Sequence, residues 1–402
     1  MYKRILSIAL VSLSIIVTSC DNEDLTLSSP QPPADLSSPT HTDATTNLID
    51  NIFNQIYGIS SRATTERTVK NCTIIYDTVT PSQIDTAFII TNYNDGGFSI
   101  VEKLNNAPKV IALSDQGEFD LECASGKFII KSAIDNRNER LSTPGVIEPS
   151  PLEPTPDYLG MSIWHGDHYC SPRGYYTTLG QQRAFVKAAW HQGDPYYHKM
   201  FQNGYSVAGC GTIAVAQVLN HFQKPEYLNG YYCSWESFQN DSTVTYETPH
   251  WTNLSNAIYE IAIGCKAVAH DFATTVKLKD VTSYLKSIGY AIATYTTGFN
   301  ESTILNDLSC RRPIIICGQM NINEYGHAWI LDGFHQLRFD KYYYRQDNNL
   351  LCNQTHETLT YYHCKWGEPD KNGNGNDNGY FLFNNFGWNL NMSFIHNIKY
   401  TK

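Results

Sequence analysis

The chain has 402 residues and carries 39 acidic side chains against 29 lysines and arginines, which gives a formal net charge of −10. Because no basic cluster stands out against this acidic background, the sequence gives no sign of binding nucleic acid or an anionic membrane face. About 380 residues remain once an N-terminal signal is set aside, a length typical of two domains.

The first twenty residues have the pattern of a secretory signal. Lys3 and Arg4 precede an apolar run that ends at Val17, which is too short to span a bilayer comfortably. Cys20 closes a Val-Thr-Ser-Cys stretch that resembles a bacterial lipobox, in which the cysteine becomes the lipidated first residue of the mature chain. We expect residues 1–20 to be a lipoprotein signal peptide, with an ordinary cleaved signal as the alternative.

Residues 21–46 contain almost no large apolar side chains, so they cannot bury enough surface to order themselves and are interpreted as a flexible tether. The acidic residues directly after Cys20 resemble the export signal of bacterial surface lipoproteins. The expected location is the cell envelope, as an outer-membrane lipoprotein that is surface-exposed or is secreted after processing. Contact with the membrane is expected only through the lipid anchor.

A small α+β domain is predicted for residues 47–141. Its first element is an amphipathic helix at 47–59, where the apolar residues recur on one face. An Asp-Gly step at 95–96 separates two strand-like runs and predicts a hairpin. The strands of the expected antiparallel sheet are 86–93, 97–104, 109–114 and 127–133.

A proline-rich joint separates this domain from the rest of the chain. Residues 142–157 favour extended, exposed backbone and exclude helix, so we expect a linker there and a natural cleavage site. The second domain is expected to cover 158–402, with strands from about 313 onward. Its predicted helices are 179–190, 210–223, 253–264 and 278–288.

Cys210 is the first candidate for chemistry. It lies between Gly209 and Gly211, at the first turn of a helix whose Val215 and Val218 continue one apolar face. The positive end of a helix favours a negative charge, so we expect a lowered thiol pKa, and the flanking glycines would let a substrate backbone approach. The alternative is a cysteine that acts as a small buried apolar residue.

His327 is the candidate base. It follows Gly326 at the start of a predicted strand, where it can face a cleft and form the thiolate–imidazolium pair that a nucleophilic cysteine needs. With 13 histidines in the chain, a solvated or structural role is the alternative.

Several ordered segments resemble the streptopain family of secreted bacterial cysteine peptidases. The hairpin region at 88–120 resembles the inhibitory pro-domain of that family. The segments that resemble its catalytic domain are WHQGDPYY at 190–197, AGCGTIAVAQVLNHFQKP at 208–225, GHAWILDGF at 326–334 and YYHCKWG at 361–367. The resemblance implies an α+β architecture, in which a papain-like cysteine peptidase domain follows a small α+β pro-domain.

The resemblance also implies roles for individual residues. Cys210 would attack the scissile carbonyl as a thiolate, and His327 would hold the thiolate and then protonate the leaving amine. Gly326 matches a position that binds substrate through its backbone, and Trp366 matches a tryptophan that shields the catalytic histidine. Gln192 occupies the family's glutamine position and is expected near the oxyanion.

One departure from the family pattern affects the histidine. Where the family has an asparagine that orients the imidazole, this chain has Lys365, and a lysine has no acceptor for an imidazole N–H. Asn385, in a second partial match, is the alternative candidate for this task.

No cofactor or metal is expected. The 11 cysteines show no Cys-x-x-Cys spacing, so the sequence predicts neither a readable disulfide framework nor a zinc site. A run at 370–375 resembles the first half of a calcium loop, but its twelfth position is Phe381, which offers no carboxylate.

The leading hypothesis is therefore an exported cysteine endopeptidase made as a zymogen. Its expected partners are protein or peptide substrates, with an apolar side chain before the residue at the cut, and its own pro-domain. A catalytically impaired surface protein of the same fold, which binds or inhibits a partner, is the alternative hypothesis. A peptidoglycan amidase would use the same Cys-His chemistry, but no cell-wall-binding module supports it.

Overall fold

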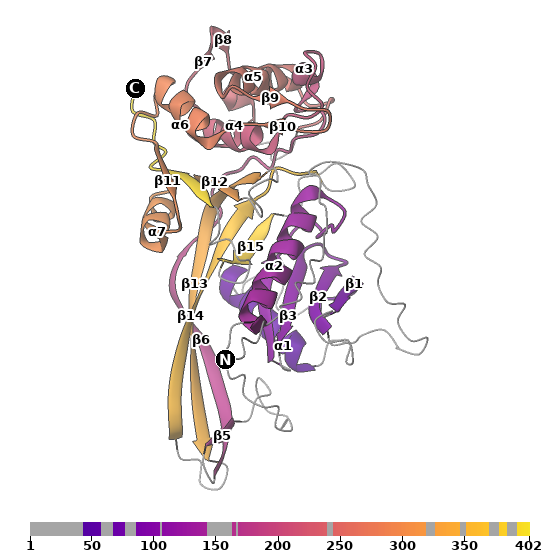
Figure 1. The fold of residues 1–402 in the computed structure, drawn as a ribbon, viewed down its shortest axis with the longest axis vertical. Coiled ribbons are helices and arrows are strands. Elements are labelled where there is room, and N and C mark those ends of the chain that lie inside the picture. The colour runs from indigo at the N-terminus through magenta and orange to yellow at the C-terminus, as the bar shows by residue number, and fades with distance from the viewer. Residues whose placement is uncertain are drawn as a thin grey trace, which may run out of the picture.

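The computed structural model describes most of both predicted domains. Its described residues are 43–57, 67–76, 86–104, 107–142, 163–165, 168–238, 244–318, 326–345, 351–369, 378–383 and 392–402. Cys20, Asn385, the run 370–375 and the proline-rich joint beyond Ser142 lie outside them. Within these residues, helices α3 to α6 gather at one end of the molecule and three long strands extend toward the other (Figure 1).

The N-terminal unit is an antiparallel meander with two helices. The hairpin predicted at the Asp-Gly step is present, and the Tyr93 N–H donates to the Gly97 carbonyl at 3.0 Å. The elements of this unit are α1 Asp43–Tyr57, β1 Val69–Tyr76, β2 Thr86–Tyr93, β3 Phe98–Leu104, β4 Ala107–Ser114 and α2 Ala124–Ser142. Helix α1 starts at Asp43, so its first turn occupies residues that we had expected in the tether.

The strand predicted at 127–133 is wrong, because these residues lie inside helix α2. Ile129, Ile130, Ala133 and Arg137 are all buried, and their spacing gives one continuous helical face. A short apolar run is compatible with both a strand and a buried helix, so periodicity alone did not separate the two.

The second part of the chain contains five further α-helices and a 3-10 turn among its described residues. The helices predicted near 210, 253 and 278 are confirmed. The bounds are α3 His198–Phe201, α4 Cys210–Phe222, the 3-10 turn η1 Trp235–Phe238, α5 Trp251–Gly264, α6 Leu278–Ser287 and α7 Glu301–Ser309. None of the helices in the described part of the chain is long and apolar enough to cross a membrane.

The helix predicted at 179–190 is wrong. Strand β6, His168–Gln182, occupies its first residues, and the chain then continues without regular structure. The Phe185 N–H donates to the Asp332 carbonyl, and the Val186 N–H donates to the Asp332 carboxylate at 3.0 Å. These bonds to a distant residue take the place of local helical ones.

Twelve strands of the described residues form one sheet that runs through both parts of the molecule. Strand β4 of the N-terminal unit pairs with β15, so that Leu113 lies opposite Tyr380 and Ala112 opposite Phe381. The order along the sheet is β1-β2-β3-β4-β15-β14-β13-β12-β16-β11, with β6 and β5 attached beside β13. The two predicted domains therefore share a continuous backbone hydrogen-bond ladder.

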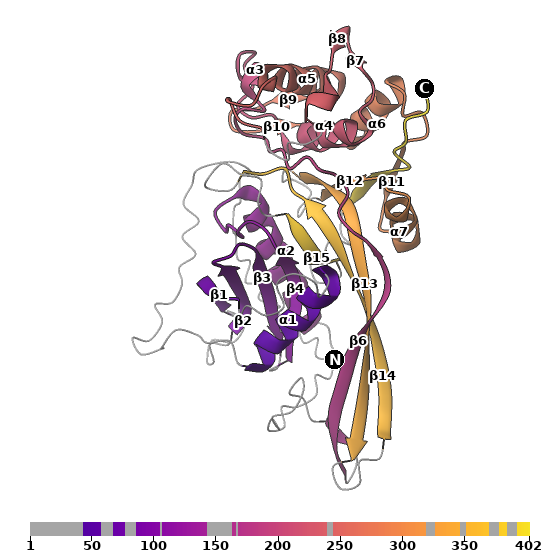
Figure 2. The ribbon, with the colours of Figure 1, turned by 180° about the vertical axis from the view of Figure 1, so that it is seen from behind.

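The C-terminal strands of this sheet include a long arm that the sequence did not predict. Strand β13, His327–Arg345, pairs with β14, Leu351–Lys365, along one edge and with β12 and then β6 along the other (Figure 2). The remaining strands of the sheet are β5 Ile163–His165, β11 Thr294–Thr297, β12 Ile314–Gly318, β15 Gly379–Leu382 and β16 Ser393–His396. Two small hairpins are formed by β7 Tyr227–Leu228 with β8 Tyr231–Tyr232, and by β9 Val268–Ala269 with β10 Thr274–Thr275.

Two apolar clusters hold the N-terminal unit against the rest. Helix α1 packs with β4 and with the base of the arm, where Leu337, Leu359 and Tyr361 are buried. Helix α2 contributes Phe128 and Ile129 to the large core that also contains helix α4. Both helices of the unit are thus buried against residues from the C-terminal half.

Candidate active site

Cys210 is the first residue of α4, as the sequence predicted. The helix is buried along nearly its whole length, and it ends where Gln223 takes a left-handed conformation with φ of 54°. Gly209 precedes the helix with φ of 83°, and a Cβ there would lie 2.5 Å from the Thr274 carbonyl oxygen. The glycine before the cysteine is therefore required by both conformation and space.

The thiol of Cys210 is partly buried and lies close to strand β13. The backbone N–H of Ala328 donates to its Sγ at 3.3 Å. Burial raises the pKa of Cys210, and the backbone N–H groups of Ala328, Gly211 and Cys210 itself offset that rise only in part. The lowered thiol pKa that we expected from the helix start is therefore wrong for this state of the protein.

His327 begins β13 and is 8% exposed. Its Nε2 lies 2.9 Å from the carbonyl oxygen of Trp366. A carbonyl oxygen only accepts, so this contact fixes the proton of the imidazole on Nε2 and leaves Nδ1 for the other side of the ring. The histidine is thus oriented by a backbone group, although Lys365 replaces the asparagine expected for that task.

The indole of Trp366 lies beside the imidazole, as the resemblance implied. The ring centroids of His327 and Trp366 are 5.9 Å apart with an interplanar angle of 28°. Trp329 stacks at 6.2 Å and 15°, and Phe128 of α2 lies 6.0 Å away. The backbone N–H of Trp366 is itself held by the side chain of Asn378, at 3.1 Å.

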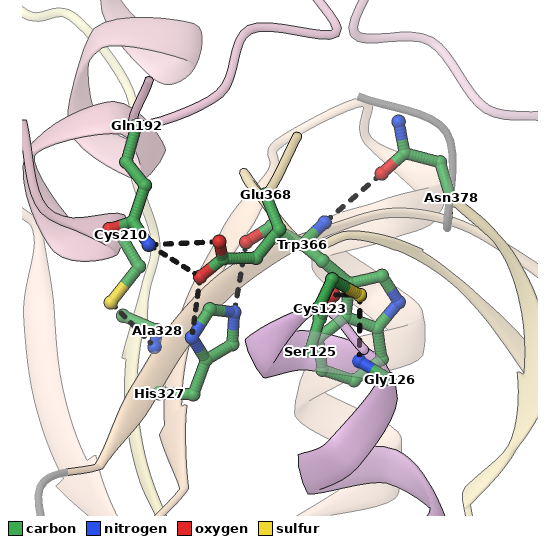
Figure 3. Close-up of polar contacts among 10 residues, drawn as sticks. All are labelled: Cys123, Ser125, Gly126, Gln192, Cys210, His327, Ala328, Trp366, Glu368 and Asn378. Carbon is green, nitrogen blue, oxygen red and sulfur yellow. Dashed lines mark hydrogen bonds and ion pairs between the residues drawn. The ribbon is translucent and has the colours of Figure 1, made fainter. Parts of the chain in front are cut away.

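Gln192 lies at the same site, and it brings a residue that the sequence analysis had not assigned. Its Nε2 donates to both carboxylate oxygens of Glu368, at 2.7 and 2.8 Å. The Oε1 of Glu368 also lies 3.6 Å from Nδ1 of His327. Figure 3 shows this carboxylate between the glutamine amide and the imidazole, with the thiol of Cys210 nearby.

Gly326 adjoins the site for a structural reason. A Cβ at this position would lie 2.7 Å from the Gly318 carbonyl oxygen and 3.0 Å from the sulfur of Cys317, so only glycine fits against β12. Contact between Gly326 and substrate stays a prediction.

Lys365 is buried in β14, away from the role of imidazole acceptor. Burial lowers its pKa, and the nearby carboxylate of Asp332 acts in the opposite direction. Asp332 in turn lies 2.5 Å from Nδ1 of His363. Lys365, which departs from the family pattern, therefore interacts across strands β13 and β14 with the buried Asp332, the partner of His363.

Two residues of the site were missed by sequence reasoning. Glu368 follows directly after Trp366 and Gly367, so its place in the motif was the only available signal. The role of Asn378 could not be predicted from the sequence, because its side chain accepts a hydrogen bond from a backbone N–H, that of Trp366. Among the described residues, no group of three or more histidine, cysteine or acidic side chains could hold a metal ion.

Comparisons with known proteins identify the family and the fold. Residues 190–389 match the model of the Peptidase C10 family. The thiol protease/hemagglutinin PrtT of Porphyromonas gingivalis is 20% identical over 291 residues, which cover 61% of this chain and 31% of that protein. The chain thus spans about a third of the length of this curated relative.

A solved structure shows the same fold. The fragment of prointerpain A from Prevotella intermedia superposes with a TM-score of 0.54 at 16% identity, and the match covers 83% of this chain and 100% of that one. The expected α+β architecture is thereby confirmed. Cys210, His327 and Trp366 all fall inside the family match. The chain therefore belongs to the Peptidase C10 family, the streptopain family of cysteine peptidases.

Proposed function

We propose that the protein is the zymogen of an exported cysteine endopeptidase. The observation that carries the proposal is that the thiol of Cys210 and the imidazole of His327 both lie at the start of β13 (Figure 3). The Ala328 N–H holds the sulfur of Cys210, and the preceding residue, His327, is fixed by the Trp366 carbonyl. A nucleophile and a base that are each oriented by a further group form the arrangement that covalent catalysis requires.

In the proposed mechanism, the Cys210 thiolate attacks the scissile carbonyl carbon. The backbone N–H of Cys210 and the side-chain amide of Gln192 would then donate to the oxyanion. His327 would pass its Nδ1 proton to the leaving amine as the C–N bond breaks, and would next activate the water that hydrolyses the thioester. Extended protein segments are the proposed substrates.

The N-terminal unit is the proposed inhibitory pro-domain, with bounds near 47–141 and a cut in the joint at 142–157. Phe128 of α2 packs against His327, Trp329 and Trp366, with centroid distances of 5.8 to 6.3 Å. A unit that shares both a sheet and a core with the site must be displaced before a long substrate can lie across it.

Export and anchoring complete the proposal. The lipobox-like segment supports a lipid anchor at Cys20, which would hold the chain at the cell envelope. Cys20→Ala should then move the protein from the membrane fraction to the soluble fraction of fractionated cells. An unchanged distribution would contradict the anchor and leave the peptidase assignment intact.

The peptidase activity is tested by comparing the processed protein with its Cys210→Ala variant on a denatured protein substrate. We expect hydrolysis by the wild type and a loss of at least about 10³-fold in the variant, since the nucleophile is absent. Cys310→Ala, which removes an exposed free cysteine, is the matched control and should keep full activity. Equal hydrolysis by Cys210→Ala and wild type would refute the assignment.

One observation favours a second candidate, a binding protein with a disabled site. The amide of Gln192, which would hold the oxyanion, is fully engaged by Glu368. An epoxysuccinyl thiol probe separates the two functions. Selective labelling of Cys210 at neutral pH indicates a peptidase, and labelling no faster than at the exposed Cys310 indicates a binding protein.

A further inference from the structure

Glu368 combines deep burial with a position between two groups that catalysis needs. It is 6% exposed, although a carboxylate is rarely buried unless it is paired. Both of its oxygens accept from Nε2 of Gln192, and Oε1 faces Nδ1 of His327 at 3.6 Å. The carboxylate therefore contacts the proposed oxyanion donor and the proposed base at the same time (Figure 3).

The ring orientation and tautomer of His327 decide which of its nitrogens can pair with Glu368 or Cys210. Nε2 carries its proton toward the Trp366 carbonyl, so Nδ1 is the nitrogen that must hold a thiolate. When Nδ1 is protonated, the imidazolium can form an ion pair with either the carboxylate of Glu368 or the thiolate of Cys210. An ion pair between His327 and Glu368 leaves the thiol neutral, and a neutral thiol is a poor nucleophile.

The same carboxylate competes with substrate. A scissile carbonyl oxygen must accept from the Gln192 amide during attack, and in this structure Glu368 accepts from that amide twice. Glu368 must therefore leave its place before a substrate is turned over. It follows Gly367, whose φ of 71° is the left-handed conformation that glycine adopts readily.

We propose that Glu368 is an internal inhibitor of the site, which pairs with His327 and Gln192 and so keeps Cys210 in its unreactive thiol form until the carboxylate is displaced. This inference rests on the proposed function, because it assigns a regulator to the Cys210–His327 pair. It attributes part of the latency to the peptidase domain itself, separately from the N-terminal unit.

Within the described part of the chain, other titratable groups near the site have identified environments. Burial raises the pKa of Cys317 on β12 to about 12, so it stays a neutral thiol at the pH values of interest. Nδ1 of His191 accepts from the Gly193 N–H. On β13 and β14, Asp332 is paired with His363 and interacts with Lys365. Helix α2 presents Phe128, which is uncharged.

The test is the rate at which iodoacetamide alkylates Cys210 in the full-length chain, followed by mass spectrometry between pH 5 and 9. Glu368→Gln keeps the shape of the side chain and removes its charge, and Glu368→Ala removes both. Glu226→Gln, which deletes an exposed carboxylate paired with Lys224, is the matched control and should react like the wild type.

We expect both Glu368 variants to shift the rise of the rate to lower pH and to react at least about ten-fold faster at pH 6, the change that one pKa unit represents. Rates equal to or below the wild type in both variants would overturn the inference, since Glu368 would then support the site. If Cys210 of the processed protein also reacts no faster than the exposed Cys310, the proposed function itself fails.

Discussion

Phe128 is the side chain through which helix α2 reaches the proposed catalytic histidine, and its truncation gives a sharp test of the interface. The ring is 7% exposed and packs against His327, Trp329 and Trp366. The ring of Phe128 also lies close to Gly318 on β12, because a Cβ built on Gly318 would be 3.2 Å from Cζ of Phe128. Phe128→Ala would therefore leave a cavity bounded by rings and a strand backbone that cannot easily collapse.

Phe-to-Ala substitutions in cores lower the free energy of unfolding by about 3–5 kcal/mol. Because the ring of Phe128 keeps a small exposed fraction, we expect Phe128→Ala to cost about 3 kcal/mol. Urea unfolding in a Cys210→Ala background, which prevents self-processing, measures the loss through the fluorescence of the adjacent tryptophans. Because α2 and the site share one core, far-UV circular dichroism should report the same transition.

Phe128→Leu is the matched control for this experiment. It keeps most of the apolar volume and should cost less than about 1.5 kcal/mol. If Phe128→Ala cost less than about 1 kcal/mol, or if tryptophan fluorescence did not change while circular dichroism did, the ring would not be part of a shared core. The account of the N-terminal unit as a cover of the site would then be refuted.

Two further predictions concern groups on either side of the site. Gly209→Ala should reduce Cys210 alkylation and lower the melting temperature, because its Cβ would lie 2.5 Å from the Thr274 carbonyl oxygen; a melting temperature equal to wild type would contradict the fit. The pKa of Asp332 lies below its ordinary value. Burial alone would raise it, but the charges of His363 and Lys365 lower it by more. This carboxylate therefore stabilises the fold above about pH 4 and loses that contribution as the pH falls below it, so Asp332→Asn should flatten the acid limb of the stability curve, and an unchanged limb would contradict the pairing.

The local elements could be predicted where their signals lie within a few residues. The spacing of Val215 and Val218 predicted helix α4, and the Asp-Gly step at 95–96 predicted the β2–β3 hairpin. Helix α2 was misread because a short apolar run is compatible with both a strand and a buried helix. Strand β6 was misread because its pairing with β13 joins residues that are far apart in the chain.

Only those residues of the site that belong to recognisable sequence motifs could be predicted. Cys210, His327 and Trp366 lie together as the ordered motifs implied. Gln192 reaches the same site through Glu368. The acceptor that orients the imidazole is a backbone carbonyl, and every residue has one, so no residue type could indicate it. Glu368 was missed because its importance depends on which side chains surround it.

The shared ladder between β4 and β15 has a consequence for how activation would scale with concentration. As long as the joint is intact, the N-terminal unit is held beside its docking surface at the high effective concentration of a tethered ligand. Cutting the joint breaks no hydrogen bond of the ladder and exposes none of the buried clusters, so the unit would stay in place as a separate chain until it dissociates. After the cut, the fraction of open enzyme would depend on dilution. Molecules kept at high concentration would then remain latent for longer than molecules released into a large volume.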